Sequence, residues 1–84
     1  MKVRTYKQFP QDWALTQNNL GKVLMDLGVR SSRIKGIRYL QKSVAAFENA
    51  LTVLTPKYYR AKNKEVQSSL EKSKQLLREV SRKK

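Results

Sequence analysis

Apolar side chains recur at every third or fourth position between residues 34 and 54, and this spacing is the strongest constraint that the chain places on its own fold. The residues concerned are Ile34, Ile37, Leu40, Val44, Phe47, Leu51 and Leu54. An α-helix turns once in about 3.6 residues, so the spacing puts all of them along one side of a helix. A half-buried strand would require an alternation with a period of about two. We therefore predict a helix with one apolar side.

A similar stripe precedes this one, in a segment that begins near Pro10. Proline suits the first helical turn because the N–H that it lacks would be unpaired there, and Asp12 adds a negative charge that the helix dipole favours. The apolar residues of this stripe are Trp13, Leu20, Val23, Leu24 and Leu27. Gly28 follows, and glycine is common just beyond the last turn of a helix. We expect the first helix to end there.

Local signals also place the ends of the later helices. Ser31 and Ser32 can each cap the second helix. Gly36 weakens the first turn of that helix by about 1 kcal/mol relative to alanine, which leaves a later start near Ile37 open. The dipeptide Thr55-Pro56 favours a third helix, with the threonine as its cap and the proline as its first residue.

The predicted fold is all-α, an antiparallel helical hairpin followed by a C-terminal capping helix. The hairpin covers residues 10–55 and the polar, solvating third helix covers residues 56–80, between an N-terminal tail of residues 1–9 and a basic tail of residues 81–84. The predicted core consists of Trp13, Leu20, Leu24, Leu27, Leu40, Val44, Phe47, Leu51, Leu54, Val66, Leu70 and Leu77. A chain of 84 residues buries only about 60% of its unfolded surface, so its stability should be marginal.

The composition argues against catalysis, metal binding and a membrane span. The chain contains no Cys and no His, which removes thiolate nucleophiles, imidazole bases and the usual zinc ligands. Its six acidic residues do not pair on one buried face, and it has no phosphate-binding Gly-x-x-x-x-Gly-Lys loop. No apolar run approaches the roughly 20 residues that cross a membrane, and the N-terminus lacks the apolar core of a signal peptide. We expect no enzyme activity, no cofactor and a cytoplasmic location.

The net charge of +13 is concentrated toward the C-terminus. Residues 56–84 hold ten Lys and Arg against three Glu, which gives this segment a charge of +7. One interpretation is an acidic partner, either nucleic acid, an anionic membrane face or an acidic protein. The other is a solvated helix face with a basic tail. The sequence leaves both interpretations open.

Two sequence blocks give a more specific indication. Residues 12–21 read Asp-Trp-Ala-Leu-Thr-Gln-Asn-Asn-Leu-Gly, and residues 40–51 read Leu-Gln-Lys-Ser-Val-Ala-Ala-Phe-Glu-Asn-Ala-Leu. In this order they resemble a tetratricopeptide repeat, of the bacterial variety whose repeats open with Asp-Trp-Ala and continue Thr-Gln-Asn-Asn-Leu-Gly. The resemblance covers roughly residues 9–56. It implies close antiparallel packing, in which Gly21 lets the facing helix approach and Phe47 fills the groove beside it.

The resemblance also implies a function in binding proteins or peptides. In this family the first helix lines the concave binding surface. The corresponding residues here are Leu15, Asn18, Asn19, Lys22 and Met25. An extended peptide or acidic tail would be bound there by the Asn amides and the Lys. Alternatively, Asn18 and Asn19 hydrogen-bond neighbouring helix ends.

Only one repeat is present, because no second copy of the opening motif follows. About three repeats are usually needed to bury their apolar faces. We therefore expect the chain to form a homo-oligomer that covers the open face of the first helix or the stripe of the second. A dimer that swaps helices by straightening the 28–37 linker is one low-cost route.

A helix-turn-helix for nucleic acid is the alternative. Gly28 would stand at the turn, and Val29, Ile34 and Ile37 have the apolar spacing of that motif. Phosphate and major-groove contacts would come from Ser31, Ser32, Arg33, Lys35 and Arg38. Leu24 stands where the tight helix crossing normally requires Ala. Non-specific binding of nucleic acid by charge alone is a further possibility.

Overall fold

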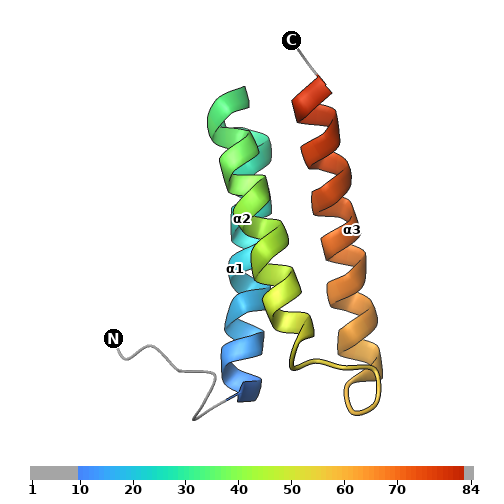
Figure 1. Cartoon of the computed structure of the whole chain (residues 1–84). Helices are drawn as coiled ribbons and strands as arrows, with labels where there is room; N and C mark the ends of the chain where they lie inside the picture. Colours follow the sequence, from blue (N-terminus) through green and yellow to red (C-terminus); the bar gives the residue numbers. More distant parts are fainter. Residues whose placement is uncertain (1–9, 83–84) are drawn as a thin grey trace, which may run out of the picture.

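The computed structural model describes residues 10–82 and contains three helices in that range. Helix α1 spans Pro10–Arg30, α2 spans Arg33–Leu51 and α3 spans Arg60–Arg82. No strand occurs among these residues. Helices α1 and α2 form an antiparallel hairpin and α3 runs alongside it, as Figure 1 shows. The prediction of an all-α hairpin with a third helix is confirmed.

Helix α2 lies between the other two helices. Both α1 and α3 pack along it, whereas α1 and α3 have very little contact with each other. The described part of the chain is consequently flat, measuring 43 × 30 × 14 Å along its principal axes. Much of the surface of α1 therefore has no neighbouring helix within residues 10–82.

Small residues form the contact line between α1 and α2. On α1 the line is Ala14, Gly21 and Gly28, and on α2 it is Gly36, Ser43 and Ala50, with all six residues buried. Each line has a spacing of seven residues, which returns to nearly the same side of a helix. Because none of these side chains is large, the two helix backbones approach closely.

Glycine is required at the closest points of this approach. A Cβ atom on Gly21 would lie 2.7 Å from Cε1 of Phe47, and one on Gly36 would lie 2.7 Å from the backbone oxygen of Gly28. The close packing expected of residues 21 and 47 is thus present. Ser43 of α2 bonds to both other helices. Its Oγ donates to the Gly21 carbonyl of α1 at 2.7 Å and lies 2.9 Å from Oγ of Ser73 on α3.

The end predicted for α1 is wrong. The helix continues through Gly28 to Arg30, and no glycine of the described residues has a positive φ. Gly28 therefore does not terminate the helix. Its role is steric, because a Cβ there would lie 2.7 Å from Cγ of Leu40. Helix α2 begins at Arg33, so the later start near Ile37 is also excluded, and the side chain of Ser32 makes no capping hydrogen bond.

The third helix starts later than predicted. Residues 56–58 form a turn, and α3 begins at Arg60. The Tyr59 amide donates to the carbonyl of Thr55 at 2.9 Å, and the buried Asn63 side chain donates to the carbonyl of Leu54 at 2.8 Å. Hydrogen bonds from Tyr59 and from Asn63 of α3 thus hold the linker in place, and Thr55-Pro56 does not start a helix.

The predicted core is correct for α2 and α3 and partly wrong for α1. Five predicted residues are buried, namely Leu40, Phe47, Leu54, Val66 and Leu70. Five others are half-buried, namely Trp13, Leu24, Val44, Leu51 and Leu77. Leu20 and Leu27 are exposed, because α1 turns its small residues toward α2. The N-terminal tail of residues 1–9 and the last two residues of the basic tail lie outside the described residues, and α3 includes Ser81 and Arg82.

Candidate functional site

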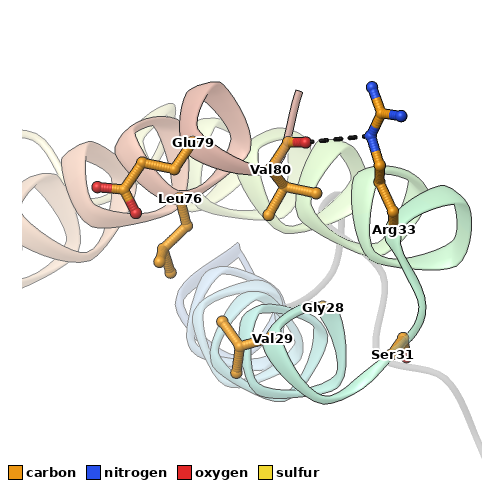
Figure 2. Close-up of a pocket in the computed structure, with 7 residues that line it drawn as sticks. All are labelled: Gly28, Val29, Ser31, Arg33, Leu76, Glu79 and Val80. Carbon is orange, nitrogen blue, oxygen red and sulfur yellow. Dashed lines mark hydrogen bonds between the residues drawn. The ribbon is translucent and has the colours of Figure 1, made fainter. Parts of the chain in front are cut away.

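A groove between α1 and α3 is the candidate site. It consists of two adjoining cavities of about 340 and about 220 Å³, which share Val29 and Leu76. Figure 2 shows Leu76 and Val80 extending from α3 toward the last turns of α1, where Gly28 and Val29 lie. The groove exists because both helices pack on α2 rather than on each other.

The groove has an apolar floor and a charged rim. Its apolar side chains are Met25, Val29, Leu76 and Val80. Its charged side chains are Lys22, Asp26, Lys72, Arg33 and Glu79. Three cations and two anions line it, so the local charge is mixed even though the chain is strongly basic. This arrangement suits an apolar side chain flanked by polar or charged groups.

One ion pair joins α1 to α3 beside the groove. Nζ of Lys22 lies 3.2 Å from Oε1 of Glu65, and Nζ of Lys62 lies 3.1 Å from Oε2 of the same carboxylate. The hydrogen bonds from Lys62 and Lys22 lower the pKa of Glu65 from its ordinary value of 4.5. The pair is solvent-exposed, so its contribution to stability is small. Its position nevertheless links the two helices that border the groove.

This pair predicts an acid-dependent loss of stability. Because the folded protein lowers the pKa of Glu65, the stabilisation is complete above the ordinary pKa and disappears as the pH falls through the lowered value. We expect Glu65→Gln to flatten the fall in melting temperature between about pH 6 and about pH 3, measured by circular dichroism. Glu71→Gln, at an exposed carboxylate without an ion pair among residues 10–82, is the control. An unchanged pH profile for Glu65→Gln would contradict this assignment.

Two other charged groups at the rim, Arg33 and Asp26, already have interaction partners within the protein. Nε and Nη2 of Arg33 each lie 3.4 Å from a carbonyl oxygen, those of Val80 and Ser81 respectively. These carbonyls belong to the last turn of α3, where the helix dipole favours a cation. Asp26 pairs with Arg30 on α1 at 3.3 Å. Lys72 makes no ion pair among residues 10–82, so it remains available to a ligand.

Only some of the residues predicted to line the binding surface lie at the groove. Lys22 and Met25 line the groove, and Leu15 and Asn19 are exposed on α1. Asn18 is 2% exposed, and its Oδ1 has no hydrogen-bond partner among the described residues. The expectation that Asn18 contacts a partner is therefore corrected, because its side chain points into the protein.

Sequence reasoning missed the α3 side of the groove. Leu76, Val80 and Lys72 were not assigned to a site, because the apolar stripe of α3 was fitted to the core through Leu70 and Leu77. A signal was present, since residues 65, 72, 76 and 80 recur at helical spacing along a second side of α3. Only the position of α1 shows what this side faces.

The helix-turn-helix alternative does not fit the geometry. Helices α1 and α2 lie antiparallel along their length, whereas the DNA-binding motif requires a crossing of roughly 90–120°. Val29 and Ile34, which that motif would bury, are 53% and 74% exposed. Among the predicted contacts, Arg33 is bound to the end of α3 and the Ser31 hydroxyl donates to the carbonyl of Leu27 at 2.7 Å. Ser32, Lys35 and Arg38 are exposed.

Comparisons of the chain with protein-family models, curated proteins and solved structures found no match. Within the described residues, no helix is long and apolar enough to cross a membrane. The same part of the chain contains no group of three or more acidic residues placed to hold a metal ion. The interpretation of the site therefore depends on its own geometry.

Proposed function

We propose that the chain is a non-catalytic interaction module that binds a peptide segment of another protein in the groove between α1 and α3. The observation that carries the proposal is an apolar floor, formed by Val29, Leu76 and Val80, that stays open between two helices. The resemblance of residues 9–56 to a tetratricopeptide repeat supports it, since the first helix of such a repeat lines the binding surface.

The groove suits an extended peptide with one apolar anchor. Burial of a Val, Leu or Phe side chain contributes about 1.5–3 kcal/mol, which by itself gives only weak binding. The remaining affinity would come from polar contacts at the rim, where Lys72 has no ion pair among residues 10–82 and Lys22 is half-exposed. The net charge of +13 would accelerate association with acidic partners over longer distances.

Two valines that point in different directions from α1 allow a matched test. Val29 lines the groove and is 53% exposed, whereas Val23 is 55% exposed and does not line either cavity of the groove. We expect Val29→Ser to weaken binding of labelled short acidic peptides, held extended by prolines and carrying one central Leu, by about tenfold, or about 1.4 kcal/mol. Val23→Ser should leave it unchanged. Fluorescence anisotropy measures both affinities, and thermal melting verifies that both variants are folded.

A peptide in which Ser replaces the central Leu completes the experiment. If it binds as tightly as the Leu peptide, the floor of the groove is not the binding surface and the proposal is wrong. Equal losses for Val23→Ser and Val29→Ser would also contradict it, because the two substitutions have the same chemistry and similar exposure.

A further inference from the structure

The side of α1 that faces away from α3 has an exposed apolar stripe. Leu20, Val23 and Leu27 are between 39% and 55% exposed, and Trp13 and Leu24 beside them are half-buried. The positions that complete this side of the helix hold uncharged Thr16 and Gln17. This surface is thus free of charge in a chain whose net charge is +13.

A row of cations on α2 runs beside this stripe. The Asn49 side chain donates to Oε1 of Gln17 at 3.3 Å, which fixes the register of the two antiparallel helices along this edge. Residues seven apart lie on nearly the same side of a helix. One such step therefore brings Lys42 beside Leu24, and a second brings Lys35 to the end of α1.

Three cations make up this row on α2. Lys35, Arg38 and Lys42 are all exposed and, together with the half-buried Tyr39, line a shallow depression of about 210 Å³. None of the three cations forms an ion pair within residues 10–82. Their charge is therefore not neutralised by the described part of the chain. An apolar stripe with an uncompensated basic border lies on the opposite side of α1 from the groove.

We infer that this surface binds an acidic amphipathic helix from a partner protein. The apolar stripe of such a helix would lie on Leu20, Val23 and Leu27, and its carboxylates would face Lys35, Arg38 and Lys42. From Leu20 to Leu27 the exposed stripe is about 10 Å long at a rise of 1.5 Å per residue, which matches about two turns of a partner helix. The one-sided basic border fixes the orientation of that helix, because its acidic flank has to face α2.

The charges favour this partner over a second copy of the chain. Two copies that met through the stripe would bring their own basic rows, and total charges of +13 each, into proximity. Like charges at an interface oppose association, whereas an acidic flank is attracted. The site is separate from the groove, so both could be occupied at the same time. The inference therefore does not depend on the peptide-binding proposal.

The test uses a labelled model helix of about 18 residues, with Leu along one stripe and Glu on one flank. We expect it to bind the full chain, and we expect Val23→Ser combined with Leu27→Ser to weaken it by about tenfold or more. Lys42→Glu should also weaken it severalfold and make the remaining affinity less dependent on salt. Matched controls are Val29→Ser on the groove side of α1 and Lys64→Glu on α3, and neither should change the affinity.

Three outcomes would overturn the inference. A scrambled peptide of the same composition that binds equally well would show that only charge is recognised. Duplex DNA or anionic vesicles that bind more tightly than the helix, and are released by the same substitutions, would assign the surface to a different ligand. A dimer in light scattering that Val23→Ser with Leu27→Ser dissociates would identify a second copy as the occupant. Loss of groove binding alone, through Val29→Ser, would leave this inference unaffected.

Discussion

Phe47→Ala is expected to remove most or all of the stability of the fold. The side chain is fully buried at the junction of the three helices. It packs in a cluster with Ala14, Ala50, Leu54, Val66 and Leu70. Truncation of a buried Phe costs roughly 3–5 kcal/mol through lost burial and the cavity left behind. For a domain this small, that is comparable to the entire free energy of unfolding.

Ile34→Ala is the control, because Ile34 is a large apolar residue of the same helix and was predicted to belong to the same apolar stripe as Phe47. Ile34 is 74% exposed, so its truncation should change stability by less than about 0.5 kcal/mol. Urea denaturation followed by circular dichroism measures both variants. If the two variants lose similar amounts of unfolding free energy, or if Phe47→Ala unfolds at the wild-type urea concentration, Phe47 is not the centre of the core.

Gly36→Ala is expected to destabilise the hairpin by about 1–3 kcal/mol, although alanine is the better helix former by about 1 kcal/mol. The added Cβ would lie 2.7 Å from the carbonyl oxygen of Gly28. That oxygen belongs to the backbone of α1, so no side-chain rotation relieves the contact. The two helices would have to separate, and the close contacts along their small-residue lines would loosen.

Local helix propensity and tertiary packing therefore predict opposite signs for this substitution. Ala45→Gly lies at an exposed position of the same helix, so it measures helix propensity without a change in packing. It should lower the free energy of unfolding by about 1 kcal/mol. Thermal and urea denaturation of both variants gives the comparison. A Gly36→Ala variant that is more stable than the wild type would show that α1 and α2 are not in backbone contact there.

Much of the fold could be predicted because helical periodicity is a local property. The spacing from Ile34 to Leu54 predicted α2 and the burial of Leu40, Phe47 and Leu54. The helix ends were less reliable. Gly28 and Thr55-Pro56 have the composition of a helix end and a helix start, yet the chain uses Gly28 for close packing and residues 56–58 for a turn.

The candidate sites could be predicted only in part. Lys22 and Met25 were expected on a binding surface and line the groove, whereas Asn18 is buried. The side of α3 that faces the groove could not be assigned, because a sequence does not state which helices touch. Lys35 and Arg38 were expected only as nucleic-acid contacts and Lys42 was not assigned to a site, because the sequence does not show that these residues border the apolar stripe of α1.

The sequence by itself determined the number of helices, their approximate extents and the burial of Leu40 and Phe47 on α2. The tertiary structure decided which side of α1 faces the core. Large residues suggested the stripe with Leu20 and Leu27, but α1 packs through Ala14, Gly21 and Gly28. The physical reason is complementarity of volume. Small residues facing Gly36, Ser43 and Ala50 let two backbones approach closely, and that approach leaves Leu20 and Leu27 of α1 exposed.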